Sequence, residues 1–164
     1  MSAFSHLRVS SEYSISQGLL TINQIVDNAS KKSIPSVALT DKSNMFGLVK
    51  FFDKCELAGI KPISGCSLNV IFDGDEGSHE LLCLAKTNNG HKNLMKIISS
   101  AHNNYSYSSP IIKFKDLTEL NDDIVVISGG KNSHIFEYLR RNNRSDAENK
   151  IDQFTKYFKD DFVL

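Results

Sequence analysis

Short apolar runs alternate with amphipathic stretches along most of this chain. The runs are rich in large apolar residues, many of them β-branched, which is typical of buried strands. The stretches between them repeat apolar residues at the spacing of one helix face. This alternation predicts an α/β fold with a mainly parallel sheet, either open or closed into a barrel. The predicted strands are residues 5–9, 35–39, 61–72, 80–86 and 122–130.

Five stretches have helical spacing, and capping residues mark some of their ends. Thr21 is suited to cap the first helix, and Gly59 to end the second in a left-handed conformation. The third begins near Asn88, and the fifth is capped by Ser145 or Asp146. The residues predicted to face inward are Ile22, Ile25, Val26 and Ala29 in the first, Leu48, Phe51, Phe52 and Cys55 in the second, and Leu94, Ile97, Ile98 and Ala101 in the third.

Two polar segments are expected to be connections, namely a turn at residues 73–78 and a longer loop at 102–110. The chain ends in Asp-Phe-Val-Leu, residues 161–164, which has the composition of another buried strand. Because a parallel strand is normally covered on both faces, we expect this chain to be part of a longer protein.

The composition narrows the function classes. The 164 residues suit one domain, and 19 basic residues balance 19 acidic ones, which gives no electrostatic case for nucleic-acid or membrane binding. No apolar stretch is long enough to span a bilayer, and no signal peptide is evident, so a cytoplasmic protein is expected. Cys55, Cys66 and Cys83 are widely spaced in apolar runs, which predicts buried free thiols.

Four blocks stand in order along the chain, at residues 6–18 (HLRVSSEYSISQG), 34–66, 81–99 and 125–131. Together they resemble the N-terminal PHP (polymerase and histidinol phosphatase) domain of bacterial DNA polymerase III alpha subunits. The resemblance implies one domain over residues 1–164, a distorted (β/α)7 barrel that is incomplete because the chain stops at Leu164. Active members bind a cluster of divalent metals at the strand ends and hydrolyse phosphoesters through a metal-bound hydroxide.

Position by position, the resemblance implies that most metal ligands are missing. The first His-x-His pair is replaced by Arg8 and Ser10, and in the Thr-Asp-His motif Asp41 is kept whereas Lys42 replaces the histidine. His6 lies in the same predicted strand, but a single imidazole makes no metal site, so a structural role is expected.

The later ligand positions are altered as well. Ser67 stands where the family has a glutamate, Glu80 where it has a histidine, and Gly130 where it has a cysteine. His79 is one residue out of register, which places it on the opposite face of the strand. One or two carboxylates cannot hold a cluster of transition-metal ions. We therefore expect no catalytic residue, no metal and no cofactor, and we interpret these positions as a vestigial cleft.

Lys42 is open to two interpretations. It neutralises Asp41 and Glu80 in a metal-free cleft, together with Arg8, or it points into solvent as most lysines do. The sequence SGGKNS at 128–133 resembles a phosphate-binding turn before a helix. It lacks the full phosphate-loop motif, however, so an ordinary strand–helix turn is the preferred interpretation.

The resemblance implies a non-catalytic scaffold domain within a DNA-polymerising protein, which would dock the separate proofreading 3′–5′ exonuclease and the rest of the polymerase chain. Tyr105 and Tyr107 are candidate docking residues, because tyrosine is enriched at interfaces. The alternatives are an active metal-dependent phosphoesterase or pyrophosphatase with altered ligands, and an α/β binding module unrelated to replication. Nucleotide polymerisation is not expected within this segment, because nothing in it resembles a palm with metal-binding aspartates.

Overall fold

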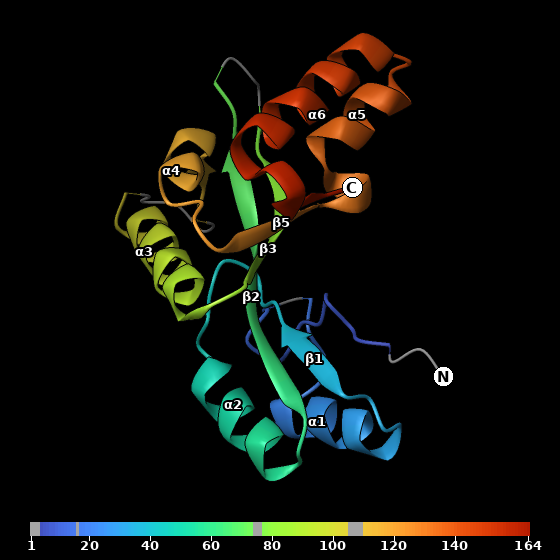
Figure 1. Cartoon of the computed structure of the whole chain (residues 1–164), viewed down its shortest axis with the longest axis vertical. Coiled ribbons are helices and arrows are strands. Elements are labelled where there is room, and N and C mark those ends of the chain that lie inside the picture. The colour runs from blue at the N-terminus through green and yellow to red at the C-terminus, as the bar shows by residue number, and fades with distance from the viewer. Residues whose placement is uncertain (1–3, 16, 74–76, 105–109) are drawn as a thin grey trace. The chain divides into compact units, whose positions relative to one another are not determined.

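A computed structural model describes residues 4–15, 17–73, 77–104 and 110–164. The chain divides into two compact units, Met1–Cys66 and Ser67–Leu164, which we call unit 1 and unit 2 and describe separately. Figure 1 labels their helices and strands. Strand β2 (Lys61–Ile71) begins in unit 1 and ends in unit 2.

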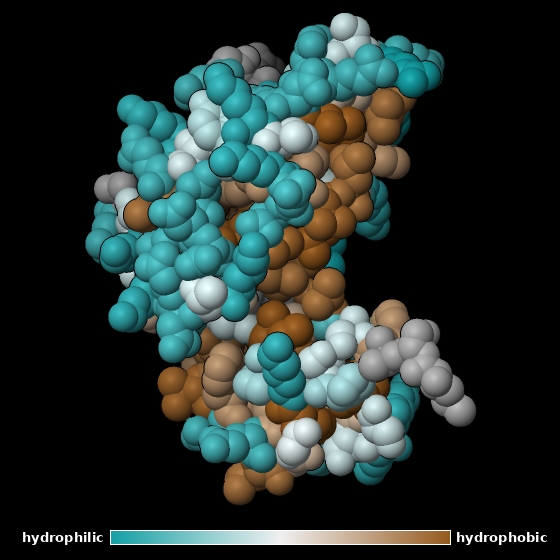
Figure 2. All heavy atoms as spheres, viewed as in Figure 1, coloured by the Kyte–Doolittle hydropathy of each residue, from teal (hydrophilic) through white to brown (hydrophobic). Residues whose placement is uncertain are grey.

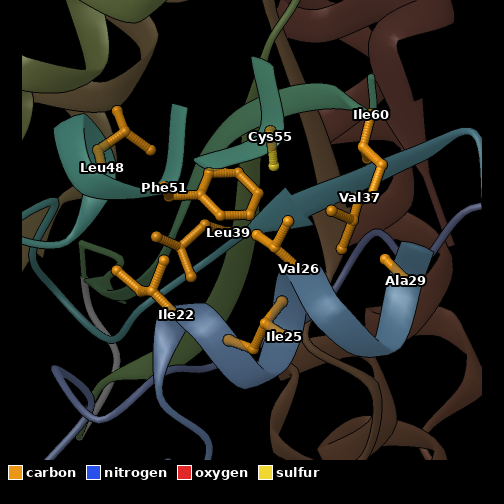
Figure 3. Close-up of a cluster of buried hydrophobic side chains, with 10 residues drawn as sticks. All are labelled: Ile22, Ile25, Val26, Ala29, Val37, Leu39, Leu48, Phe51, Cys55 and Ile60. Carbon is orange, nitrogen blue, oxygen red and sulfur yellow. The ribbon is translucent and has the colours of Figure 1, made fainter. Parts of the chain in front are cut away.

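Unit 1 packs two helices against a pair of parallel strands. Its elements are α1 (Ile22–Lys31), β1 (Ser36–Leu39), α2 (Leu48–Leu57) and the first part of β2. The parallel register aligns Ser36 with Lys61 and Leu39 with Ser64. Figure 3 shows the core between these elements, with Phe51 of α2 among aliphatic side chains from α1 and β1. The predicted inner face of α1 is confirmed, because all four of its residues are buried.

The ends of both helices in unit 1 have strong local signals. The Thr21 hydroxyl accepts a hydrogen bond from the Gln24 backbone N–H at 3.2 Å, and the Gln24 side chain accepts one from the Thr21 N–H at 2.9 Å. This is the reciprocal capping box expected at a helix start. Each helix ends in a residue with positive φ, Ser33 at 51° after α1 and Gly59 at 66° after α2.

Unit 2 consists of a sheet and the helices that pack against it. Its elements after β2 are β3 (His79–Ala85), α3 (Asn88–Asn104), β4 (Ile112–Lys113), α4 (Phe114–Glu119), β5 (Ile124–Ser128), a 3-10 turn (Gly130–Asn132), α5 (His134–Arg140), α6 (Arg144–Phe158), a second 3-10 turn (Lys159–Asp161) and β6 (Phe162–Val163). An aromatic cluster forms much of the core, in which Phe154 of α6 stacks on Phe162 of β6 with ring centroids 4.6 Å apart.

The strand pairing confirms a mixed α/β fold whose sheet contains parallel strands, with one antiparallel pairing. Strands β1 and β2, β2 and β4, and β5 and β6 pair in parallel, whereas β3 and β5 are antiparallel, with Cys83 opposite Val126. Only seven residues, 72–78, connect β2 to β3. This connection is shorter than the dozen or more residues that a crossover between parallel strands needs. Among the described residues the strand order is the open path β1-β2-β3-β5-β6, with β4 beside β2.

Several local predictions are wrong. Phe52 is 39% exposed, because α2 turns only Leu48, Phe51 and Cys55 into the core. Helix α3 continues to Asn104, two residues beyond the start of the predicted 102–110 loop. Helix α6 is capped by Asn143, whose side chain accepts a hydrogen bond from the Asp146 N–H.

Other predictions are only partly tested by the structure. Residues 5–9 form an isolated parallel bridge from His6 to Val37 rather than a full strand. Half of the predicted turn at 73–78, namely 74–76, lies outside the described residues, as do the candidate docking residues Tyr105 and Tyr107.

Large apolar side chains also remain at the surface of unit 1. Ile15 and Leu19 are 87% and 95% exposed on a short loop, and Phe46 and Val49 are exposed before and within α2. The space-filling view in Figure 2 shows brown, hydrophobic residues at the surface of the viewed face. Scattered apolar residues are normal on protein surfaces.

Candidate functional site

The carboxyl end of β1 is fastened to the N-terminal segment by Thr40. Its hydroxyl accepts a hydrogen bond from the Val9 N–H at 2.9 Å and donates one to the Val9 carbonyl oxygen at 3.1 Å. The Thr40 N–H donates to the same carbonyl at 2.8 Å. Thr40 therefore fixes the position of residues 9–11 beside the strand end.

The next residue, Asp41, is the centre of the site in unit 1. Its side chain is buried, with only 1% exposure. The carboxylate accepts hydrogen bonds from the Ser11 N–H at 2.7 Å, the Ser11 hydroxyl at 2.7 Å and the Ser14 hydroxyl at 2.6 Å. Burying a carboxylate is costly unless it is paired or hydrogen-bonded. Here the two serines meet both oxygens, and we call this arrangement the serine clasp.

Lys42 contacts the serine clasp through its backbone. Its N–H donates to the Ser14 hydroxyl at 3.0 Å, and no ion pair joins its ammonium to the Asp41 carboxylate in the part of the chain that the structure describes. Of the two interpretations of Lys42, pairing with Asp41 is the one that these contacts do not support, because hydroxyl and amide donors already satisfy the carboxylate. Arg8 is exposed and Ser10 is half-buried beside Ser11, so neither of these vestigial positions donates one of the three hydrogen bonds to Asp41.

The turn after Asp41 is held by groups that sequence reasoning missed. The Asn44 amide donates to the carbonyl oxygens of Tyr13 at 3.0 Å and Lys42 at 2.9 Å. The Cys66 thiol donates to the Asp41 carbonyl oxygen at 3.2 Å. The available signal was the pair of serines, Ser11 and Ser14, three residues apart and upstream of a strand that ends in Thr-Asp.

Unit 2 has its own carboxylate at a strand start. The Ser67 hydroxyl donates to Glu80 Oε1 at 2.5 Å, and the Asn132 amide donates to Glu80 Oε2 at 2.9 Å. Gly129 lies so close that a Cβ there would be 2.1 Å from the Glu80 carbonyl oxygen, and Gly130 follows with φ of 59°. The structure thus brings Ser67, Glu80 and the turn containing Gly130 together.

His79 lies on the other side of β3 from Glu80. Its side chain is 8% exposed and stacks on His134 of α5, with ring centroids 4.1 Å apart and planes 9° from parallel. Glu80 instead contacts Ser67 and Asn132. The predicted opposite placement of the two residues follows from the alternation of side chains along a strand.

Among the residues that the structure describes, His6 belongs to no group of potential metal ligands. It is exposed on the N-terminal segment, and its ring makes an edge contact with Phe4 at 4.8 Å. Among the described residues, no group of three or more His, Cys, Asp or Glu side chains is arranged to hold a metal ion. The donors around Asp41 are hydroxyl and amide hydrogens rather than further metal ligands, so this part of unit 1 does not fit a transition-metal cluster.

These features define an α/β protein with one hydrogen-bonded carboxylate just after a strand, Asp41, and another at the start of a strand, Glu80. The family model described as "PHP domain" matches residues 6–164, and this chain belongs to that family. No helix among the described residues is long and apolar enough to cross a bilayer.

The chain is also similar to two curated relatives. It is 38% identical to DNA polymerase III subunit alpha of Escherichia coli (strain K12), over 98% of this chain and 14% of that protein. It is 35% identical to DNA polymerase III subunit alpha of Borreliella burgdorferi, over 99% of this chain and 15% of that protein. The chain therefore spans about one seventh of the length of these relatives.

Among solved structures, an amidohydrolase from Chromobacterium violaceum with bound sulfate and no metal is similar at a TM-score of 0.49. Its sequence identity is 21%, and the match covers 60% of this chain and 33% of that one.

Proposed function

We propose that this chain is a non-catalytic PHP domain of a replicative DNA polymerase alpha subunit, acting in the cytoplasm as a structural scaffold. The observation that carries the proposal is the serine clasp around Asp41. A carboxylate that serves a metal must keep oxygen lone pairs free for the ion. Asp41 instead directs both of its oxygens to Ser11 and Ser14, which fasten the N-terminal segment to β1.

Under this proposal the carboxylate has a structural task in place of a catalytic one. Three hydrogen bonds to a buried charge order residues 11–14 and, through them, the loop that presents Ile15 and Leu19. Charge-assisted hydrogen bonds are about twice as strong as neutral ones, so the clasp is a rigid attachment. Polymerisation then belongs to other parts of the longer protein, as the relatives' names and lengths suggest.

We further propose that the domain docks the proofreading 3′–5′ exonuclease and contacts the rest of the polymerase chain. A domain without its own metal site needs editing to come from a separate active site. The exposed apolar residues of unit 1 support a docking role, because covering aliphatic side chains with a partner removes them from water and lowers the free energy of the complex.

The proposal is tested by metal binding and by hydrolysis. Calorimetric titration of the purified chain with Mn²⁺ and Zn²⁺ is expected to show no saturable site that depends on Asp41, and hydrolysis of p-nitrophenyl phosphate with Mn²⁺ should equal the buffer rate. Asp41→Asn and the exposed Asp27→Asn are the matched pair. Metal-dependent hydrolysis that Asp41→Asn abolishes and Asp27→Asn leaves intact would establish an active phosphoesterase instead.

The docking part has a separate test. Immobilised chain is expected to retain the exonuclease at micromolar concentration, and the double variant Ile15→Ser, Leu19→Ser should release it. A matched surface change elsewhere, Leu139→Ser on the exposed side of α5, should not. No retention by the unaltered chain would refute exonuclease docking and leave the scaffold role to the metal experiment.

A further inference from the structure

Unit 1 contains a cavity whose lining includes neither Asp41 nor the two serines of the clasp. Its volume is about 290 Å³, and it lies between the N-terminal segment, α1 and β1. Most of its wall is aliphatic, with Val9, Ile25 and Val37 among the lining residues. Ligand pockets in proteins start at roughly 300 Å³, so this one has room for one small molecule.

The walls of the cavity are fixed by backbone hydrogen bonds. The Ala38 N–H donates to the His6 carbonyl oxygen at 2.9 Å, which holds the N-terminal wall on β1. On the other side, the Ile34 N–H donates to the Ala29 carbonyl oxygen at 2.9 Å, and the Ser33 N–H donates to that of Ser30 at 3.0 Å. These two bonds are the Schellman pattern that closes a helix, and it brings Ile34 and Ala29 together as one wall. The cavity is therefore preformed.

The polar part of the lining contains a cationic residue and no anionic one. Lys32 is the lining residue with a permanent charge, His6 and Asn28 supply hydrogen-bonding groups, and the lining contains no carboxylate. All three are exposed, whereas Ile25, Ala29 and Val37 are buried. The cavity thus combines an aliphatic floor with a cationic, hydrogen-bonding rim.

We propose that this cavity binds a small amphipathic monocarboxylate, with an aryl or short alkyl body on the aliphatic floor and the carboxylate at Lys32. The apolar body loses water-exposed surface, which is the main driving force. The ammonium and the neighbouring polar groups select an anion over a neutral or cationic head group. The site is independent of the proposed polymerase role, since it uses neither Asp41 nor the exposed loop.

The probe for this site is 3-phenylpropionate, titrated into the isotopically labelled chain and followed by amide NMR shifts. A ligand of this size is expected to bind in the millimolar range. The amides that move should be those around the cavity, such as Ala29, Ile34 and Val37. The neutral analogue 3-phenylpropanamide is the chemical control and should bind about threefold to fivefold more weakly, the range of an exposed ion pair.

Two substitutions test the aliphatic floor and the cationic rim of the cavity separately. Ala29→Leu places a larger side chain in the cavity wall and should weaken binding at least tenfold, with the melting temperature showing that the chain is still folded. Lys32→Met should reduce the affinity for the carboxylate to that of the amide. Lys31→Met removes the same charge from the adjacent position, which does not line the cavity, and should leave binding unchanged.

The proposal fails on any of three results. These are shifts that do not saturate or that map away from the cavity, equal affinity for carboxylate and amide, and equal effects of Lys31→Met and Lys32→Met. If Ala29→Leu does not fold, Val37→Ile replaces it as the test of the floor, since Val37 also lines the cavity and the change adds only a methylene group.

Discussion

At the scale of single residues, the most informative change is Asp41→Asn. The amide keeps one acceptor oxygen but turns an N–H group toward the hydroxyl donors of Ser11 or Ser14. Hydrogen bonds to a charged group contribute about 1.5–3 kcal/mol each, and partial reorganisation recovers some of the loss. We expect the free energy of unfolding to fall by roughly 2–3 kcal/mol in urea denaturation. Asp27→Asn, on the exposed face of α1, should change it by less than about 0.5 kcal/mol. Equal free energies of unfolding for the two variants would show that the clasp does not stabilise the fold.

A second prediction concerns the two left-handed residues that end α1 and α2. Ser33 has φ of 51° and Gly59 has φ of 66°, a region that costs a side-chain-bearing residue about 1 kcal/mol. Ser33→Gly should therefore stabilise unit 1 by about 0.5–1 kcal/mol, and Gly59→Ala should destabilise it by a similar amount. A Cβ on Gly59 would meet no atom within 4 Å, so the second effect is conformational and not steric. Urea denaturation measures both, and stabilisation by Gly59→Ala would contradict the assignment.

At the scale of helices and strands, the cap of α6 gives a sharp contrast. Asn143 accepts a hydrogen bond from the Asp146 N–H at 3.3 Å, whereas Ser145, one of the two caps that the sequence suggests, is an exposed residue inside the helix. Asn143→Ala is expected to cost about 1 kcal/mol, the usual loss for a removed N-cap. Ser145→Ala should cost nothing or stabilise slightly, because alanine is the better helix former. Equal losses in thermal denaturation would mean that the helix begins later than the structure shows.

Helices and strands were easier to predict than the positions where they begin and end. The apolar spacing of Ile22, Ile25 and Val26, or of Leu94 and Ile97, identifies a helix and its buried face, since burial imposes that period. Both Asn143 and Ser145 are good capping residues, so local sequence could not choose between them. Phe52 adjoins Phe51 and differs only in which way the helix turns it. The antiparallel pairing of β3 depends on contacts with β5, forty residues away, which no local pattern contains.

The candidate site was also predictable only in part. Asp41 could be located from the Thr-Asp motif at a strand end, because β1 itself was predictable. Its donors could not be assigned, since Ser11 and Ser14 lie about thirty residues earlier and reach it only through the pairing of Thr40 with Val9. Lys42 looked like the natural counter-charge because it is adjacent in sequence. Adjacent residues at a strand end point in different directions, and the chain used distant hydroxyl groups instead.

At the scale of the whole chain, the buried thiols define a pH dependence. Burial raises the pKa of Cys55 to about 11 and that of Cys83 to about 12, from an ordinary value near 9. The folded state therefore holds its thiol protons to higher pH than the unfolded state, and stability falls as pH rises from about 9 toward 11 and 12. Urea denaturation between pH 8 and pH 10.5 should show this decline. Cys83→Ala should reduce its slope, and an unchanged slope would show that other groups cause it.

The same thiols report on whether the two units unfold separately. Cys55 is in the core of unit 1 beside Phe51, and Cys83 is in unit 2, whose core includes Phe154. Phe51→Leu leaves a cavity in unit 1 and should cost that unit about 1.5 kcal/mol or more. Labelling by a thiol reagent at pH 8, read by mass spectrometry, should then accelerate about tenfold at Cys55 and less than twofold at Cys83. Phe154→Leu is the matched variant and should reverse the pattern. If either variant accelerates both thiols equally, the chain opens as a single cooperative unit, and the division at Cys66 has no energetic meaning.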